Sequence, residues 1–397
     1  MSLVPSGRPQ VVPSPPTHPF LLALALVTAL FGAAAFTPAP AEGARKVFVS
    51  PGGSDGGRCT VRKPCRSFDR AYRAARPGQV VVVRAGRYPD QTIGRDRRKT
   101  SPRDVIFRPA KGARVVISTD LDVHGSHITF SGLRLLENWY AHPGAGDLTF
   151  RRMKAQRFYV TSASNVRVIR GNYGPSVNNV AQIKSATGST VAPKNILLHR
   201  VFFHDFTRTS SEQHMECLHV MAVRGLVIRQ SRFKRCSIFD VSFNLHGESG
   251  QMKGILVENN YFDRTLDGGH YAVMFADSGR CQAVVRYNTF LQGIASECAE
   301  VGRGVRIHSN ILPSSPSRCG NNGYSWNWNV YERGERCGRN DRVSRVRFVG
   351  RKSFDLRLAK GASAIGRGNP NSLPRVDILG KRRPYGRRPD AGAHERH

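Results

Sequence analysis

Acidic residues are scarce in this chain. It carries 28 Asp and Glu against 61 Lys and Arg, a formal net charge of +33 over 397 residues. A surface of this sign suits an acidic partner such as a uronate polysaccharide, an anionic cell envelope or nucleic acid. The sequence shows none of the standard nucleic-acid-binding modules, so we do not expect nucleic acid and favour an acidic polysaccharide.

Zinc motifs are also missing. The eight cysteines contain no CxxC pair, which argues against a zinc ribbon. His214, Glu216 and His219 are spaced as HxExxH, not as the HExxH of zinc proteases, and we expect them on a turn and a strand. The scarcity of acids disfavours a carboxylate-rich Ca²⁺ cage. No metal or cofactor is assigned, and Ca²⁺ stays the one candidate, with potential ligands at Asp240, Asp277, Glu297 and Glu300.

Long apolar runs are absent with one exception. The stretch FLLALALVTALFGAAAF, residues 20–36, carries no charge and is followed by the small residues TPAPAEGA. This pattern predicts a secretory signal peptide over residues 1–44, cleaved after Ala41 or Ala44. An uncleaved anchor at residues 20–36 is the alternative, because 17 residues is near the lower limit for a membrane span. We therefore expect a secreted protein whose residues 45–397 form the folded domain.

The cysteines fit export. An even number in a chain with a signal peptide suggests disulfide bonds. Pairing by proximity alone gives bonds that each close a short loop, and other connectivities stay open. The proximity pairs are Cys59–Cys65, Cys217–Cys236, Cys281–Cys298 and Cys319–Cys337.

What the sequence does contain is an internal repeat. Short aliphatic runs recur, each followed by polar residues, often Asn, and then by an aromatic or large apolar residue. A near-constant period of this size is typical of a stacked repeat. The aromatic positions are Tyr173, Phe203, Phe233, Phe262 and Phe290, at steps of 30, 30, 29 and 28 residues, and a step of 21 leads to Ile311.

The repeating unit is extended rather than helical. Runs such as Val166–Ile169 and Leu226–Ile228 are three or four residues long and aliphatic, which favours short strands. No apolar i, i+3, i+4, i+7 pattern passes through them. Roughly 30 residues hold three strands of about five residues with their turns, and one such coil buries its apolar face only in a stack. The sequence predicts an all-β, single-stranded parallel β-helix, with one repeat per coil.

The segment before the repeats predicts a cap for the end of this solenoid. Ser67 is placed to cap a short helix in which Phe68, Ala71 and Tyr72 share one face. An amphipathic helix of this kind would cover the apolar end of the first coil.

Both ends of the folded region resemble a known superfamily. VFVSPGGSD (Val47 to Asp55) and PGQVVVVRAGRY (Pro77 to Tyr88) are similar to the opening of secreted bacterial right-handed parallel β-helix proteins of the pectate-lyase-like superfamily. SFDLRLAKGASAIGRG (Ser353 to Gly368) and PDAGAHE (Pro389 to Glu395) resemble their closing coil. The resemblance implies a right-handed β-helix. The short catalytic signatures of the pectate lyase and polygalacturonase families are not present, so it assigns no catalytic residue.

Alternation along the strands before each repeat motif predicts a site. If Leu218, Val220, Val241 and Phe243 point inward, the polar residues between them point outward and form a patch when the strands stack in register. Such a cluster suits general acid–base catalysis or a divalent metal, whereas a solvated polar face is the alternative interpretation. The candidate catalytic residues are His214, Glu216, His219, Asp240, His246 and His270, joined in the patch by Glu300. The candidate substrate-binding residues are Arg224, Asn244 and Lys253.

These observations predict a secreted β-helix protein that acts on an acidic polysaccharide as a lyase, working as a monomer. A lyase needs a group that neutralises the uronate carboxylate and a base that removes the adjacent proton. Two alternatives stay open. One is a non-catalytic envelope or adhesion solenoid that binds glycans, and the other is a glycoside hydrolase, which would use two carboxylates such as Glu216 and Asp240.

Overall fold

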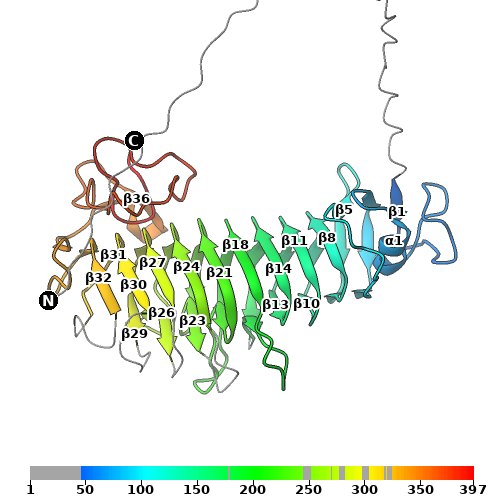
Figure 1. The fold of residues 1–397 in the computed structure, drawn as a ribbon, viewed down its shortest axis with the longest axis horizontal. Coiled ribbons are helices and arrows are strands. Elements are labelled where there is room, and N and C mark those ends of the chain that lie inside the picture. The colour runs from blue at the N-terminus through cyan, green and yellow to red at the C-terminus, as the bar shows by residue number, and fades with distance from the viewer. Residues whose placement is uncertain are drawn as a thin grey trace, which may run out of the picture. The chain divides into compact units, whose positions relative to one another are not determined.

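A computed structural model describes residues 46–177, 179–244, 252–269, 271–276, 282–296, 304–316, 319 and 324–397. The chain winds through three parallel sheets, A, B and C (Figure 1). A typical coil contributes one strand to each of the three sheets. The predicted all-β parallel β-helix is confirmed. Candidate residues His246 and His270 and the cysteines Cys281 and Cys298 lie outside the described residues, as do residues 1–45 with the predicted signal peptide.

Sheet A is built from β1 (Val47–Val49), β2 (Val80–Val83), β5 (Val105–Pro109), β8 (Ser126–Ser131), β11 (Gly146–Arg151), β14 (Ser164–Ile169), β18 (Lys194–His199), β21 (Val223–Arg229), β24 (Met252–Glu258), β27 (Ala283–Arg286), β30 (Val305–His308) and β32 (Tyr324–Asn327).

Sheet B is built from β3 (Gly86–Tyr88), β6 (Val115–Ile117), β9 (Arg134–Leu135), β12 (Lys154–Ala155), β15 (Asn172–Tyr173), β19 (Phe202–Thr207), β22 (Arg232–Cys236), β25 (Tyr261–Phe262), β28 (Thr289–Phe290), β31 (Ile311–Leu312), β33 (Val330–Tyr331) and β34 (Arg342–Val343), and β16 (Ser176–Val177) pairs with β19.

Sheet C is built from β4 (Gln91–Ile93), β7 (Leu121–Val123), β10 (Asn138–Ala141), β13 (Arg157–Thr161), β17 (Ala181–Lys184), β20 (Leu218–Val220), β23 (Val241–Asn244), β26 (Tyr271–Ala276) and β29 (Gly293–Ser296).

The repeated aromatic residues form a stack inside the solenoid, as the sequence predicted. Phe203, Phe233, Phe262 and Phe290 are at most 1% exposed, and successive rings in this series lie 5.0, 5.0 and 4.6 Å apart. The sequence pattern gave Ile311 as the next member of the stack, which is one position too early. Thr289 pairs with Ile311, so Phe290 lies over Leu312, which continues the stack. Buried rings thus set the register of sheet B.

The asparagines of the repeat form a second ladder at the turn between sheets A and B. Each side-chain amide donates to the side-chain oxygen of the asparagine in the next coil, at 3.0 to 3.1 Å. The same amides also donate to backbone carbonyls of the preceding coil, so the buried polar groups of the turn are satisfied. The ladder consists of Asn260, Asn288, Asn310 and Asn329.

The predicted N-terminal cap is present as α1 (Phe68–Ala74). Ser67 accepts a hydrogen bond from the Arg70 amide at 3.1 Å and begins the helix. Phe68 is fully buried and stacks on Phe107 of β5, with ring centroids 5.1 Å apart. The helix therefore covers the end of the core with a ring that extends its aromatic packing.

Three of the four predicted disulfides are confirmed: Cys59–Cys65, Cys217–Cys236 and Cys319–Cys337. Within the described ranges, the helices are too short or too polar to span a bilayer.

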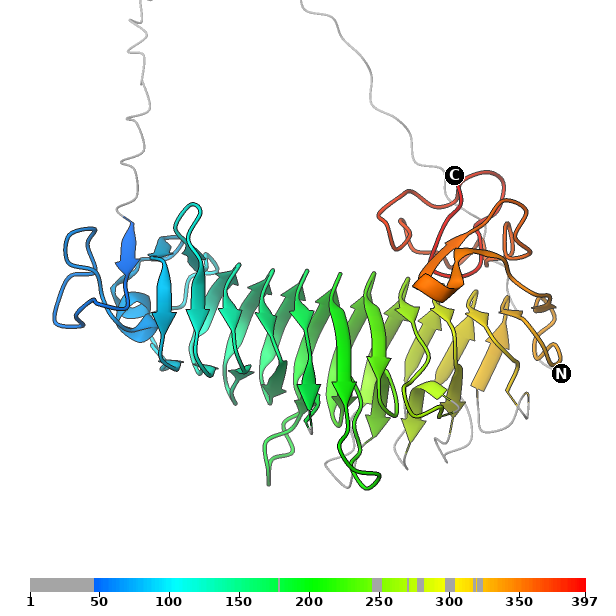
Figure 2. The same cartoon turned by 180° about the vertical axis from the view of Figure 1, so that it is seen from behind.

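The C-terminal segment packs on the solenoid at the turn between sheets A and B. It begins with an antiparallel hairpin of β35 (Phe348–Gly350) and β36 (Asp355–Leu358), joined by the 3₁₀ turn η2 (Arg351–Ser353). The side chains of Gln230 and Asn259 donate to backbone carbonyls of Asp377 and Val376. Figures 1 and 2 show this segment on the side of the solenoid opposite the strands of sheet C.

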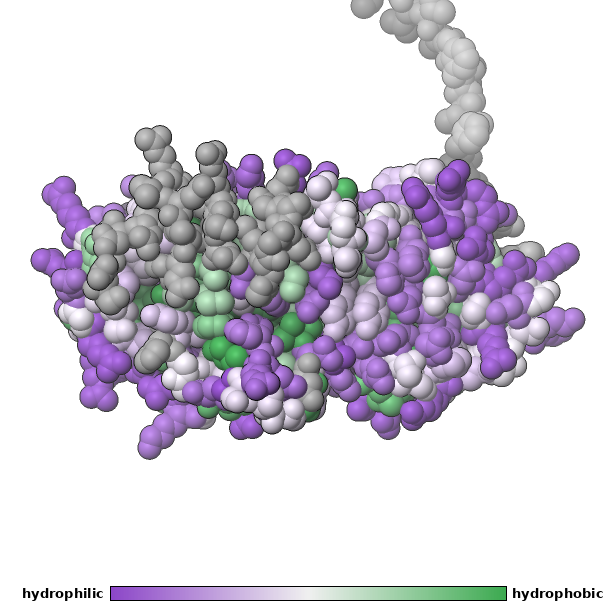
Figure 3. Space-filling model, turned by 90° about the horizontal axis from the view of Figure 1, so that it is seen from below, coloured by the Kyte–Doolittle hydropathy of each residue, from purple (hydrophilic) through white to green (hydrophobic). Residues whose placement is uncertain are grey.

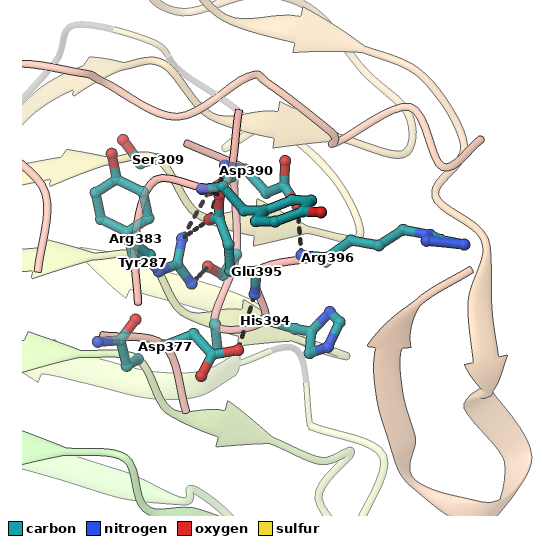
Figure 4. A network of polar contacts seen from close by, with 12 residues as sticks. Tyr287, Ser309, Asp377, Arg383, Asp390, His394, Glu395 and Arg396 are labelled. Atoms are coloured by element: carbon teal, nitrogen blue, oxygen red, sulfur yellow. Dashed lines mark hydrogen bonds and ion pairs between the residues drawn. The ribbon is translucent and has the colours of Figure 1, made fainter. Parts of the chain in front are cut away.

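A buried polar network holds the C-terminal segment in place (Figure 4). The Arg383 guanidinium lies 3.2 Å from the Glu395 carboxylate, and both side chains are 0% exposed. Arg383 also donates to the carbonyls of Asp390 and Gly392, both at 2.8 Å. Burial raises the pKa of Glu395 to about 7. Because removing one partner of such a pair leaves a buried charge uncompensated, a substitution of Arg383 or Glu395 alone should strongly destabilise the fold.

Candidate functional site

Sheet C aligns one polar row along the solenoid axis. Register pairs the middle residues of successive strands, and neighbouring strands lie about 4.8 Å apart, so these side chains follow one another like the rungs of a ladder. Towards the N-terminal end the row is aromatic and acidic, and towards the C-terminal end it reaches the candidate histidine. The row consists of Asp122, Tyr140, Tyr159, Gln182, His219 and Ser242.

Two tyrosines form a platform in this row. The rings of Tyr140 and Tyr159 are 4.8 Å apart and 4° from parallel. Arg157, on the same strand as Tyr159, donates through Nε to the Tyr159 hydroxyl at 2.9 Å. Burial raises the pKa of Tyr140 to about 12, and the nearby Asp120 adds to the effect. The platform therefore places two parallel aromatic rings next to a guanidinium, an arrangement on which sugar rings can pack.

A histidine–aspartate pair follows beside the platform. His142 Nε2 lies 2.6 Å from Asp122 Oδ1, and the His142 ring stacks on His124 with centroids 4.1 Å apart. Burial lowers the pKa of His124, and the neighbouring His142 lowers it further. The sequence interpretation missed this pair and the platform. The signal was available, because NWYA and RFYVT alternate apolar and polar residues in consecutive coils.

A second cluster lies two coils further on, where buried polar atoms lack partners. Glu216, Asp240 and Ser242 are 1%, 0% and 0% exposed. Among the described residues, neither Asp240 oxygen, nor Glu216 Oε2, nor Ser242 Oγ has a hydrogen-bond partner. Buried polar groups are normally hydrogen-bonded, so the unpaired atoms within these 27 residues single out this part of the described chain as a candidate site.

The electrostatics of this cluster favour protonated carboxyls. Burial raises the pKa of Asp240 well above 3.8, and the charge of Asp263 raises it further. Burial likewise raises the pKa values of Glu216 and Asp263. A raised pKa keeps a carboxyl protonated to a higher pH than an exposed carboxyl, which is what a proton donor requires.

An open groove of about 650 Å³ adjoins Asp263. Among its lining residues are the next two in the chain, Arg264 and Thr265, together with Tyr271 and Trp326. Seen from below, hydrophobic side chains reach the surface mainly in the C-terminal half of the solenoid, and the N-terminal half is more hydrophilic (Figure 3). The groove thus combines the aromatic side chains of Tyr271 and Trp326 with two arginines, Arg264 and Arg333.

The structure brings together only part of the predicted patch. His219 and Ser242 are register partners on β20 and β23, and the half-buried Asn244 ends β23. His219 was expected to project into solvent, but it is only 5% exposed. His214 is 75% exposed, and its Nδ1 lies 3.9 Å from Glu216 Oε1.

The predicted substrate-binding cations lie on another sheet. Arg224 and Lys253 pair with each other in sheet A, in one row with Lys194. On sheet C itself, Lys184 ends β17, two residues beyond the register partner of His219. Lys184 is therefore a cation of the same face that the sequence interpretation did not single out.

No group of three or more His, Cys, Asp or Glu side chains able to hold a metal is found among the described residues. Of the four potential Ca²⁺ ligands named from the sequence, Asp240 is the one that the described ranges include.

No protein-family model matches the chain, and no curated protein sequence is significantly similar to it. Solved structures resemble it at low identity. Pectate lyase Pel9A is 14% identical with a TM-score of 0.46, covering 89% of this chain and 98% of that one. XylC in complex with xylose is 8% identical with a TM-score of 0.49, covering 88% and 99%. A mannuronic-acid-specific polysaccharide family 6 lyase from human gut microbiota is 16% identical with a TM-score of 0.42, covering 65% and 63%.

Proposed function

We propose that this protein is an exported polysaccharide lyase that binds an acidic polymer along sheet C and cleaves it beside His219. The observation that carries the proposal is the single row on sheet C. It leads from the Tyr140–Tyr159 platform to a cluster of buried carboxyls, three of whose oxygens have no hydrogen-bond partner among the described residues. A polymer needs a track longer than one subsite, and an aligned row over several coils supplies one.

The proposed reaction is an elimination. His219 removes the proton from the carbon that bears the uronate carboxyl, the electron pair forms a C=C bond, and the glycosidic C–O bond to the next carbon breaks. Glu216, whose pKa burial raises, donates a proton to the departing oxygen. Lys184 neutralises the uronate carboxylate and so acidifies the proton to be removed. No water is consumed, and one product carries the double bond.

The deciding test is a panel of uronic-acid polymers, read by the absorbance of unsaturated products. The wild-type protein should produce this absorbance with one of them. His219→Asn should lower the rate by about 10²–10⁴-fold, the range typical of a lost acid or base. His199→Asn, a half-buried histidine on sheet A, serves as the matched control and should keep full activity.

Other outcomes separate the alternatives. New reducing ends without absorbance, lost in Glu216→Gln and Asp240→Asn, would indicate a hydrolase that uses the two buried carboxyls. Retention of a polymer without any product would indicate a binding solenoid. A fully active His219→Asn protein would refute the role of His219.

A further inference from the structure

Five arginines converge on one cavity at the C-terminal end of the solenoid. The cavity measures about 720 Å³ and is lined by Trp328 between β32 and β33, by residues between β33 and β34 and on β34, and by the C-terminal segment. It is separate from sheet C, because β33 and β34 belong to sheet B. We call it the arginine pocket, and its arginines are Arg336, Arg339, Arg342, Arg367 and Arg388.

Among the described residues, the lining of the arginine pocket carries more positive than negative charge. Within the described part of the chain, no carboxylate forms an ion pair with any of the five guanidinium groups. Two acids line the cavity, Glu335 and Asp341. Asp341 is already engaged, because its oxygens accept from the backbone amides of Asn329 and Gly338, each at 2.7 Å. One exposed carboxylate, Glu335, therefore faces five cations, which favours an anion from outside.

The walls of the pocket are held by backbone contacts. The amide of Ala391 donates to the Ala364 carbonyl at 2.9 Å, and that of Gly368 donates to the Pro389 carbonyl at 2.8 Å. Asp390, visible in Figure 4, accepts from the Gly366 amide at 2.7 Å. Arg367 and Arg388 are therefore carried by two chain segments that are tied together. These hydrogen bonds distinguish the pocket from a basic tail that is simply solvated, because such a tail would not be held in place by backbone contacts.

The shape and composition of the pocket indicate the class of ligand. A volume of about 720 Å³ is larger than a single small anion requires. The five positive charges of the guanidinium groups also exceed the negative charge of one such anion. Guanidinium forks bind carboxylates, sulfates and phosphates in pairs of hydrogen bonds. Trp328 is half-buried in the wall and offers a ring of the kind on which sugars pack.

We propose that the arginine pocket is a second, non-catalytic binding site for a segment of acidic polysaccharide that carries several carboxylate or sulfate groups. It would hold the polymer at the end of the solenoid, away from His219. Binding at this site does not require that the protein cleave the polymer.

The test is calorimetric titration of the full chain with four probes. They are a de-esterified oligogalacturonide, a sulfated heparin oligosaccharide, an uncharged maltohexaose and a single-stranded oligodeoxynucleotide. The triple variant Arg339→Ala/Arg342→Ala/Arg388→Ala should bind the better acidic oligosaccharide at least about tenfold more weakly, since each lost charge-assisted hydrogen bond is worth a severalfold change. The single variant Arg339→Ala should show a smaller loss in the same direction, which covers the case in which the triple variant does not fold.

The matched control removes the same charge elsewhere. Arg62, Arg97 and Arg108 are exposed residues near the other end of the solenoid, and their triple alanine variant should bind like the wild type. Equal losses in both triple variants would overturn the proposal, because net charge alone would then explain binding. Binding of the oligonucleotide alone, or of no acidic oligosaccharide, would also overturn it. Cleavage is not measured, so failure of the lyase proposal would leave this result unchanged.

Discussion

Tyr140 and Tyr159 lie face to face in neighbouring coils of sheet C, with ring centroids 4.8 Å apart and ring planes 4° apart. Both side chains are half-buried, so each ring keeps an accessible part on the proposed polymer track. Parallel β-helix geometry places such pairs wherever consecutive coils carry an aromatic residue at the same register position. The pair lies towards the N-terminal end of the row, and His219 lies two coils further along the same row.

The first prediction concerns this platform. Tyr159→Ala should raise the KM for the polymer by about two- to tenfold with a smaller change in kcat, because an aromatic contact is worth about 0.5–1.5 kcal/mol. Tyr159→Phe keeps the ring and should stay near the wild type. Tyr385→Ala removes a tyrosine that is 59% exposed in the C-terminal segment and serves as the control. An unchanged KM in Tyr159→Ala would remove the platform from the track.

The second prediction concerns pH. Burial raises the pKa of Asp240, so the folded protein binds this proton more tightly than the unfolded chain does. The resulting stabilisation is complete below about pH 3.8 and is lost as the pH rises through the folded-state pKa. Asp240→Asn removes this ionisation, so its Tm should fall less than that of the wild type as the pH rises above about 3.8.

Asp96 provides a control for this experiment, because its contribution to stability depends on pH in the opposite direction. Hydrogen bonds from Arg98 lower the pKa of Asp96 to about 2, so the stabilisation from Asp96 is present above its unfolded-state pKa and is lost as the pH falls towards 2. Asp96→Asn should therefore lose stability at neutral pH. A Tm profile of Asp240→Asn parallel to that of the wild type would contradict the assignment of a raised pKa to Asp240.

The third prediction concerns the aromatic stack. Phe233 is fully buried between Phe203 and Phe262, at 5.0 Å from each ring. Phe233→Ala should lower the free energy of unfolding by about 3–5 kcal/mol, because it leaves a cavity in a close-packed interior. Denaturant titration measures this loss, and Phe202→Ala, on the same sheet but half-exposed, should cost much less. Similar losses in both variants would argue against a continuous stack.

The fourth prediction concerns the disulfide Cys217–Cys236, which closes a loop of 19 residues next to the candidate site. Replacing both cysteines by serine should lower the free energy of unfolding by about 3 kcal/mol, the value typical of a loop of this length. Because Glu216 and His219 flank Cys217 closely, polymer cleavage should fall as well. Normal stability in the double variant would show that packing alone fixes this bend.

The fifth prediction concerns Cys281 and Cys298, which lie outside the described residues. We expect them to be bonded to each other, since the other six cysteines pair among themselves. Alkylation without reductant, followed by mass spectrometry, should find no free thiol and a peptide that joins Cys281 to Cys298. Alkylation of either residue would contradict this pairing.

Much of the architecture was predictable because it depends on period and local pattern. Phe203, Phe233, Phe262 and Phe290 recur at nearly constant spacing, and an interior stack is the arrangement that buries all of them. Ser67 and the apolar face of residues 68–72 indicated the capping helix for the same local reason. The error at Ile311 arose where the coil shortens, because a changed period no longer fixes which of two adjacent apolar residues faces inward.

The site was less accessible to sequence reasoning. Alternation placed His219 on the outer face of its strand, but it could not show that the side chain is only 5% exposed, because burial there depends on residues distant in the sequence. Arg224 follows β20 closely in the chain, yet the turn from sheet C to sheet A carries it onto another face. Tyr140, Tyr159 and His142 lie outside the histidine-rich segment. To place them in the site, one has to know the register between the coils that carry them.

The repeat, the strand pattern, the capping helix and the positive charge depend on spacing and composition within short segments, so the sequence alone was enough to predict them. Three properties needed the folded chain: the polar side chains that share a row, the carboxyls that are buried, and the place where five arginines line one cavity. Those properties depend on register between coils and on the return of the C-terminal segment to the turn between sheets A and B. Contacts of that kind join residues that are far apart along the chain.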